Sequence, residues 1–560
     1  MNKNMKSRLL LILLLLPLCL GAKAPKKVTA GRSSVVSILT FKDGKLLRSG
    51  TGVFTGSDGE LLSTYSLFVD CDSAVAIDNR GTMRQIVKVS GADEIYDCIR
   101  AYAQPDKKLQ ALTPATQPST TAEKLYLVAY GMKKSGTIEE TTIEKVDTIA
   151  GGNSYYTISL PKREKHTSAP LLNEQGELVA LLQSVGTGDT LKSHAISAKF
   201  VKSLTIKAAN YNSNRFTRIG IKKSLPETEE EALSCLMLQS FSSDSTAYST
   251  MLTEFLAQYP ESYQGYLHRA EYNVSKLKEY KEALADWEKA LTLADKKEEV
   301  WYHKANILYA NKLYADSLAG TAYSIDTAIA CIDRAIEIDR QPLFMRLKGN
   351  LHYTKRDYAT AFDSYASLSS TNLRSAEIFM LAANCKEILG DSDAAILQLD
   401  SAIATFGRVP ITAMAPYVLN RGLVKYRAGR YREAVLDYNI YENLLSGNVN
   451  ANFYYMRQQA EYNGKMYRLA LADIELALKL EPENILFLLE KGRLCYRVNM
   501  IDDALPTLEK AVKIAPDSPD AYYLLARCQM AKGNKAAAKQ NLEKAQKLGH
   551  PGAAETLKSL

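Results

Sequence analysis

The pattern of apolar and polar positions changes once along the chain, near residue 226. Upstream, short apolar runs are separated by Gly, Asp and Asn turns, which is typical of strands in a β-barrel or sandwich. Downstream, apolar residues recur at helical spacing, which predicts amphipathic helices. A polar, basic stretch at 207–225 separates the two regions and is typical of a linker. The expected strands include 34–41, 75–77, 86–89, 125–129, 155–160 and 178–183.

The helical region, 226–560, repeats one internal spacing. A small or modest residue is followed 12 positions later by Ala, 16 later by a large apolar residue and 19 later by a packing residue. Small residues let two antiparallel helices approach closely, and the large residue fills the gap. This spacing resembles the tetratricopeptide repeat, which implies an α-solenoid of about eight units. Six regular units have their small position at Gly349, Ala383, Gly422, Gln458, Gly492 and Ala526, two units at Ala270 and Ala305 carry insertions, and 226–260 is a degenerate leading unit.

The first 24 residues have the order of a secretory signal peptide. Lys3, Lys6 and Arg8 precede an apolar run at 9–20, and small residues follow it. This run is too short to span a bilayer, and no later stretch is long enough to anchor the chain. We therefore expect a periplasmic or otherwise extracytoplasmic protein without a transmembrane anchor after signal removal. Lipidation at Cys19 is disfavoured, because Leu18 is bulkier than the residue that lipoprotein signals prefer.

Composition excludes several classes of protein. A chain of 560 residues is too long for one core, so two or more domains are expected. The net charge of +8 is dispersed along the chain, which favours a solvated surface over a nucleic-acid partner. There is no CxxC motif or Cys/His cluster, so neither structural zinc nor another cofactor is expected.

Segments of the first region resemble the trypsin-like serine proteases, especially the HtrA type. The stretch SGTGVFTGSDGELLSTYSLF at 49–68 is similar to the glycine-rich strand, turn and T-N-x-H-V strand of that family. YDCIRAYA at 96–103 is similar to the D-L-A-V-L strand, and KHTSAPLLNEQGELVALLQS at 165–184 to G-N-S-G-G-P-L with its hairpin. HAISAKFVKSL at 194–204 is similar to the family's A-I-P ending and following helix. The resemblance implies an all-β, trypsin-like double barrel over 28–206.

The resemblance also implies a degenerate catalytic triad. It places Ser66, Asp97 and Thr167 at the positions of the base, the aspartate and the nucleophile. Serine cannot replace histidine as a base near neutral pH. The first histidine of the chain, His166, neighbours Thr167, and adjacent residues of an extended segment point to opposite sides. Lys165 replaces a glycine of the oxyanion loop, so we expect no catalytic residues and a structural role for Asp97.

Cys71 and Cys98 are the candidate pair for a disulfide. They lie in the strand-rich region, just beyond the segments that carry triad positions in the protease fold. The resemblance therefore implies that their backbones lie near one another.

The first helix of each repeat in such a solenoid lines the concave surface. Asparagine directly follows the small position in three units, and tyrosine stands four residues after the small position in several units. One of these asparagines is preceded by an arginine at a distance of one helical turn. The same arrangement occurs in repeats that clamp a C-terminal carboxylate. Amide and tyrosine side chains suit the binding of an extended peptide, although both also support packing. The candidate protein-binding residues are Asn306, Tyr309, Arg346, Asn350, Tyr353, Asn384 and Tyr426.

These features favour an exported, non-catalytic adaptor or scaffold that binds one or more envelope proteins or peptides. One alternative is an envelope serine-type protease with an atypical site at Thr167 or Ser168, whose repeats recruit substrate. A second is a structural subunit in which both domains act only as interfaces.

Overall fold

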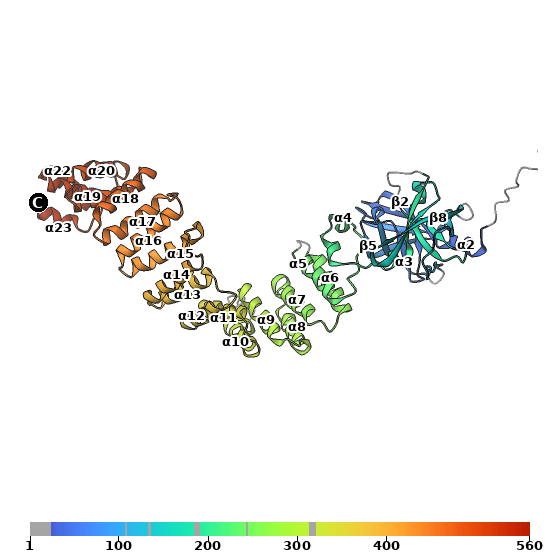
Figure 1. The fold of residues 1–560 in the computed structure, drawn as a ribbon. Coiled ribbons are helices and arrows are strands. Elements are labelled where there is room, and N and C mark those ends of the chain that lie inside the picture. Colours follow the sequence, from blue (N-terminus) through green and yellow to red (C-terminus); the bar gives the residue numbers. More distant parts are fainter. Residues whose placement is uncertain (1–23, 107–108, 133–135, 184–190, 242–244, 313–320) are drawn as a thin grey trace, which may run out of the picture. The chain divides into compact units, whose positions relative to one another are not determined.

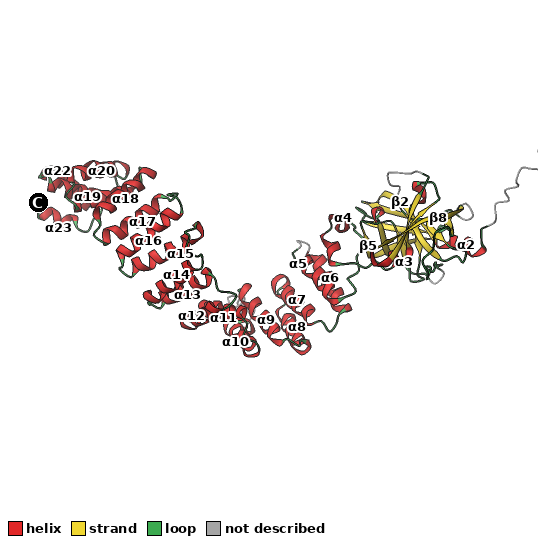
Figure 2. Ribbon diagram, in the orientation of Figure 1, coloured by secondary structure: helices red, strands yellow, loops and turns green. Residues whose placement is uncertain are grey.

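The computed structural model describes residues 24–106, 109–132, 136–183, 191–241, 245–312 and 321–560. The chain divides into two compact units, Met1–Leu293 and Ala294–Leu560. Figures 1 and 2 show that the strands gather in the first part of the chain and that helices follow from α5 onward. The apolar leader lies outside the described residues, so the signal peptide stays a prediction. Within the described chain, no helix is both long and apolar enough to cross a bilayer.

The strands of the first unit form two closed antiparallel barrels of six strands each (Figure 2). The strand order is β1-β2-β3-β6-β5-β4 in the first barrel and β10-β11-β12-β9-β8-β7 in the second. The first barrel contains β1 Val35–Lys42, β2 Lys45–Phe54, β3 Glu60–Ser63, β4 Ser73–Ile77, β5 Met83–Asp93 and β6 Cys98–Ala103. The second contains β7 Lys124–Val128, β8 Ile138–Ile149, β9 Asn153–Ile158, β10 Pro170–Leu172, β11 Leu178–Leu182 and β12 Ser193–Ser197.

Every strand expected from the apolar runs coincides with an observed strand, which confirms the β-barrel class. The longest strand, β8, was not expected. Its sequence IEETTIEKVDTI is largely polar, and its burial pattern is mostly intermediate or exposed. A strand with one wet face and few apolar residues offers no apolar run, so only its pairing with β7 and β9 identifies it.

The two barrels share a buried apolar core. Val35, Val53 and Leu62 of the first barrel pack in one cluster with Val128 and Leu172 of the second. Two short helices complete it: α2 (Lys26–Ala30) contributes a buried valine, and α3 (Ala198–Lys202) contributes a buried phenylalanine and valine. The relative position of the barrels, and therefore of the cleft between them, depends on this cluster.

Residues 207–225 pack against the first barrel, although their polar composition predicts a linker. Phe216 and Ile219 are fully buried in the barrel's core cluster. The backbone N–H of Gly220 donates to the Cys71 carbonyl at 2.7 Å, and a side chain at Gly220 would collide with that strand connection. A few well-placed apolar residues are therefore enough to bind this segment to the barrel, and helix α4 (Asn214–Thr217) lies within it.

The disulfide expected between Cys71 and Cys98 is absent, and this expectation is corrected here. Both cysteines are buried free thiols. The Cys71 side chain lies in the core of the first barrel, whereas Cys98 lies in the core shared by both barrels. Burial raises the pKa of the Cys71 thiol to about 11, which disfavours its reactive thiolate.

Two helix pairs of the first unit follow the barrels. They are formed by α5 (Glu229–Ser240) with α6 (Ser245–Gln258) and by α7 (Tyr263–Tyr272) with α8 (Tyr280–Leu293). In the second pair Ala283 follows Ala270 by 13 positions, whereas the regular offset is 12. The additional residue is accommodated in a π-helical turn, Asn273–Leu277, which continues α7.

The second unit consists of antiparallel helix pairs, in agreement with the repeat spacing. In each regular pair the small position lies on the first helix, and the Ala and the large residue lie on the second. The insertion between Ala305 and Ala328 falls partly outside the described residues. The helices are α9 Lys297–Ala310, α10 Ile325–Ile338, α11 Pro342–Thr354, α12 Tyr358–Ala366, α13 Ala376–Ile388, α14 Ser392–Ala404, α15 Ala415–Arg427, α16 Tyr431–Leu444, α17 Ala451–Asn463, α18 Tyr467–Leu480, α19 Ile485–Arg497, α20 Ile501–Ile514, α21 Pro519–Ala531, α22 Lys535–Lys547 and α23 Ala553–Lys558.

Size complementarity within a pair explains the small position. A Cβ added to Gly349 would lie 2.6 Å from the Tyr365 ring, and one added to Gly422 would lie 2.7 Å from the Tyr438 ring. Tyr365 and Tyr438 are among the largest fully buried side chains. Where the partner is the smaller leucine, the first helix carries alanine in the pairs with α14 and α22, and glycine in the pair with α20, where Gly492 faces Leu508.

We expect the Gly422→Ala variant to be less stable, although alanine is the better helix former. The new methyl group collides with a buried ring, which costs about 1–3 kcal/mol, whereas replacing a helical glycine gains up to about 1 kcal/mol. Urea denaturation followed by circular dichroism measures the difference. Adding Tyr438→Leu recreates the alanine–leucine combination of the neighbouring pair and should recover part of the loss. A Gly422→Ala variant as stable as wild type would contradict the close packing of α15 and α16.

Candidate functional site

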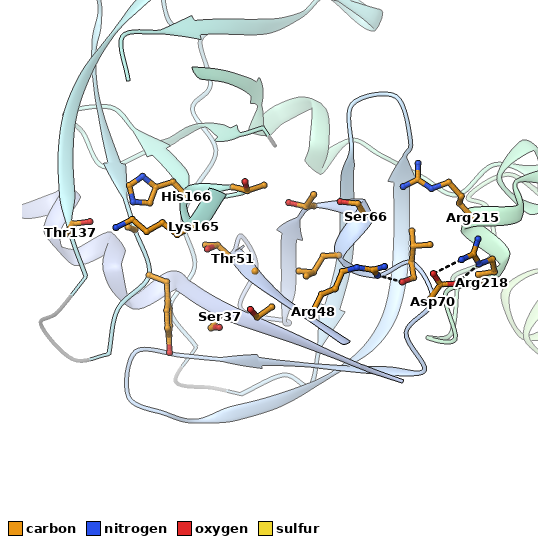
Figure 3. Close-up of a pocket in the computed structure, with 18 residues that line it drawn as sticks. Ser37, Arg48, Thr51, Ser66, Asp70, Thr137, Lys165, His166, Arg215 and Arg218 are labelled. Atoms are coloured by element: carbon orange, nitrogen blue, oxygen red, sulfur yellow. Dashed lines mark hydrogen bonds and ion pairs between the residues drawn. The ribbon is translucent and has the colours of Figure 1, made fainter. Parts of the chain in front are cut away.

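A cavity of about 1150 Å³ opens between the two barrels (Figure 3). Arg48 and Thr51 of β2 and Ser66 of the turn after β3 line it from the first barrel, and Lys165 and Thr167 line it from the second. The resemblance to proteases places two of its three triad positions, Ser66 and Thr167, on this one cavity. No group of His, Cys, Asp and Glu side chains suited to a metal ion occurs in the described part of the chain.

Ser66 and Asp97 are joined by two hydrogen bonds. One Asp97 oxygen accepts from the Ser66 backbone N–H at 2.7 Å, and the other accepts from the Ser66 hydroxyl at 2.9 Å. Ser66 lies in a 3-10 turn, Tyr65–Leu67, and Asp97 has a φ of 48° in the turn before β6. Burial raises the pKa of the Asp97 carboxyl, and the bonds from Ser66 oppose that rise. The Asp97 carboxylate therefore fixes the position of the Ser66 hydroxyl group.

The segment before Thr167 is not the extended strand that the sequence predicts. It begins with a 3-10 turn, Glu164–His166, and both His166 and Thr167 line the cavity. No hydrogen bond joins these two side chains among the described residues. The His166 Nδ1 atom is buried and has no hydrogen-bond partner, and burial lowers the pKa of this imidazole. The His166 N–H donates to the Arg163 carbonyl at 2.9 Å, so it does not point a free donor into the cavity.

Ser168 is turned into the protein interior. It is buried, has a φ of 59°, and donates its backbone N–H to the Leu182 carbonyl at 2.8 Å. Its hydroxyl forms a hydrogen bond with the Thr64 hydroxyl. A hydroxyl held in this way is not presented to a substrate in the cavity.

Four of the candidate residues in the helical region meet at one buried tyrosine, Tyr365. The Tyr365 hydroxyl donates to the Asn350 side-chain oxygen at 2.8 Å. Tyr309, Arg346 and Tyr353 lie close enough to influence the pKa of Tyr365, which burial raises. The Asn350 amide therefore supports the packing of α11 on α12, in addition to any contact with a ligand.

The remaining candidates lie on the first helices of other pairs. Asn306 and Asn384 are partly exposed, and Tyr426 accepts a hydrogen bond from Asn463 at 3.1 Å. Arg346 is also partly exposed and forms an ion pair with Glu377 of the next first helix at 3.0 Å. These positions fit a surface formed by successive first helices.

Comparison with known proteins identifies the helical part. Residues 499–559 match the family model of the tetratricopeptide repeat. A stretch of 109 residues is 31% identical to Sperm-associated antigen 1 of Mus musculus and 33% identical to that of Rattus norvegicus. It covers 20% of this chain and only 12% of each relative. The carboxyl-terminal helices are tetratricopeptide repeats.

Similar solved structures include serine proteases. The serine endoprotease from Yersinia pestis is 14% identical with a TM-score of 0.28, covering 31% of this chain and 62% of that one. The active form of the Rv3671c protease from M. tuberculosis is 17% identical with a TM-score of 0.29, covering 36% and 87%. The two closed six-stranded barrels have the double-barrel architecture of trypsin-like proteases, as expected for 28–206.

Helix pairs of the second unit contain a tyrosine pair at the turn between their two helices. The rings of Tyr353 and Tyr358 are 5.3 Å apart in a T-shaped arrangement, and those of Tyr426 and Tyr431 are 5.6 Å apart. A third pair has the same geometry in α17 and α18. Packing thus accounts for at least part of the recurrence of tyrosine at this repeat position.

A recurring ion pair in the repeats was missed in the sequence. Arg421 bonds Asp437, and Arg457 bonds Asp473, with shortest distances of 2.6 Å in both cases. Each arginine directly precedes the small position of its repeat, and each aspartate directly precedes the large apolar residue. The arginine and the aspartate are therefore 16 positions apart. Arg269 and Asp286 form the corresponding pair 17 apart in the repeat with the π-helical turn. This constant offset is the signal that would have revealed the pair.

The Arg457 pair extends into a buried cluster of charged groups. Its guanidinium contacts Asp473 and, at 2.6 Å, Glu442. Glu461 lies beside Asp473 and is 3% exposed, with one oxygen unpaired. Burial and the neighbouring Asp473 carboxylate raise the pKa of Glu461 to about 8, while Arg457 partly opposes the rise.

Stability of the repeats should therefore fall as the pH rises from about 5 to 9. The raised pKa means that folded Glu461 keeps a proton that the unfolded chain releases above its ordinary pKa of 4.5, so its contribution is complete at low pH and lost through about pH 8. The Glu461→Gln variant should lose less stability over this range, by about 1.4 kcal/mol for each pKa unit of the shift.

Urea denaturation at pH 5, 7 and 9 measures this difference. The Glu475→Gln variant changes an exposed carboxyl on α18, the partner helix of α17. Its free energy of unfolding should depend on pH as that of the wild type does. Parallel profiles for wild type and Glu461→Gln would show that Glu461 ionises normally.

Proposed function

We propose that the chain is an exported, non-catalytic adaptor that binds other proteins through its barrel domain and its tetratricopeptide repeats. The observation that carries this proposal is the pair of hydrogen bonds between Ser66 and Asp97. In a hydrolytic triad the aspartate orients an imidazole, which takes a proton from the nucleophile. Here the aspartate orients a hydroxyl group, which cannot accept that proton near neutral pH.

The other groups of the cavity do not replace the missing base. His166 is buried, makes no hydrogen bond to Thr167, and follows a turn whose N–H groups bond within the segment. Ser168 is bonded to Thr64 and lies in the interior. Loss of one triad member costs several powers of ten in rate because the members act together, and here the base and the nucleophile both differ.

Protein binding is supported by the repeats. Their first helices carry partly exposed amide, tyrosine and arginine side chains in successive units, among them Asn306, Asn384 and Arg346. Such side chains hydrogen-bond peptide backbones and carboxylates. Export is supported by the order of charged, apolar and small residues in the leader.

We expect the purified mature protein to resist a fluorophosphonate probe and to leave unfolded casein intact, because no base activates Thr167 or Ser168. Gel fluorescence and mass spectrometry measure labelling and cleavage, with trypsin as the positive control. Stoichiometric labelling that disappears in Thr167→Ala or Ser168→Ala would overturn the non-catalytic assignment and favour the atypical protease.

The Arg346→Ala variant should lose affinity for the partner recovered by crosslinked pull-down from envelope extract. Loss of a charged hydrogen bond costs roughly 1.5–3 kcal/mol, which is about ten- to a hundredfold in affinity. Isothermal titration measures the loss, and circular dichroism verifies that the variant melts near the wild-type temperature.

The matched control is Arg334→Ala. Arg334 also pairs with a glutamate, at 3.1 Å, but lies on α10, the second helix of its pair. If wild type and Arg346→Ala bind the partner with equal affinity, the partner contacts a surface other than that of the first helices.

A further inference from the structure

The cavity between the barrels carries an excess of positive charge. Arg48, Lys165, Arg215 and Arg218 line it, and Asp70 is the one carboxylate among its described lining residues. Arg218 binds both oxygens of Asp70, at 2.5 and 2.6 Å. The negative charge of the lining is thus already neutralised by one of the four cations.

The other three cations have no ion-pair partner among the described residues. The Arg48 guanidinium donates to the Val69 carbonyl at 2.5 Å, which fixes its position without compensating its charge. Arg215 lies over the Tyr65 ring at 5.5 Å, and Lys165 is exposed.

The carboxylates nearest to Arg215 are already held by hydroxyl groups. Glu94 accepts hydrogen bonds from Tyr65 and Ser213, and Asp97 accepts from Ser66. Arg215 lowers the pKa of both carboxyl groups only by long-range electrostatic attraction, since neither carboxylate forms an ion pair with it in the described structure.

The charged groups stand on opposite walls. Figure 3 shows Lys165 and His166 on one side of the cavity and Arg48, Arg215 and Arg218 on the other. The lining also carries hydroxyl groups, those of Ser37, Thr51 and Ser66 among them. His166 belongs to the same lining, and its Nδ1 atom is buried without a hydrogen-bond partner.

We infer that this cavity binds an acidic segment of another protein in an extended conformation. Successive side chains of an extended chain point to opposite sides with a rise of about 3.3 Å per residue, so carboxylates at neighbouring positions can reach both charged walls. Charge-assisted hydrogen bonds from guanidinium and ammonium groups to carboxylates are the strong ones. The inference rests on the proposed function, because an adaptor must hold the segment without cutting it.

The dimensions and lining favour a peptide over other anions. A volume of about 1150 Å³ exceeds what a single small anion fills. Single-stranded nucleic acid binds on several stacked aromatic rings, whereas Tyr130 is the one Phe, Tyr or Trp side chain among the described lining residues.

The test uses the full-length mature protein and a fluorescein-labelled decapeptide in which pairs of adjacent glutamates are separated by serine and glycine. Fluorescence anisotropy should show binding that weakens with added salt, and a peptide with glutamine in place of glutamate should bind at least tenfold more weakly. The Lys165→Glu/Arg215→Glu variant should lose ten- to a hundredfold in affinity. The control Lys26→Glu/Lys199→Glu makes the same change in net charge at exposed sites that do not line the cavity, and it should bind as wild type does.

Three results would overturn the inference. They are absence of binding to wild type, equal loss in both double variants, and displacement of the peptide by oligothymidylate with the same dependence on Lys165 and Arg215. Mass spectrometry of the recovered peptide separates this inference from the proposed function. A bound but cleaved peptide would overturn the non-catalytic assignment, and a peptide that does not bind would leave that assignment intact.

Discussion

The apolar core shared by the two barrels is the interaction on which the amino-terminal domain depends. Leu62 at the end of β3 and Leu172 of β10 belong to one cluster, and the segments that follow or precede these strands carry Ser66 and Thr167. The walls of the cavity are therefore held in place chiefly by dispersion and the hydrophobic effect between barrels, and the hydrogen bond between Thr64 and Ser168 also joins the two barrels. Most of the polar lining can therefore change without loss of the fold.

A comparable division of roles exists within the repeats. Glycine opposite tyrosine, or alanine opposite leucine, sets how closely two helices of a pair approach. Buried pairs such as Arg421–Asp437 then connect the same two helices. Replacing one member of such a pair leaves a charge uncompensated, so the ion pairs specify the helix arrangement more than they add net stability. The side chains left partly exposed on the first helices are free to differ between units.

The cavity combines residues that are far apart in the sequence. Arg48 comes from β2, Lys165 from the turn before β10, and Arg215 from the segment after the second barrel. The segment that carries Arg215 is basic, but its composition alone does not show where these positive charges lie. Its apolar residues Phe216 and Ile219 fix it to the first barrel, and its arginines are thereby directed to the cavity.

The sequence by itself determined the two barrels, the repeats and which residue, Ser66, stands at the position that the protease resemblance assigns to the base. These features depend on local periodicity, on a constant spacing and on residue identity, all of which can be observed along one chain. The tertiary structure alone decided the rest: that Cys71 and Cys98 lie in separate cores, that 207–225 is packed, and that β8 is a strand. It also decided that unpaired cations meet in one cavity and that Asn350 bonds Tyr365. Each of these depends on which distant side chains become neighbours, and that is settled by packing the whole chain and not by any local pattern.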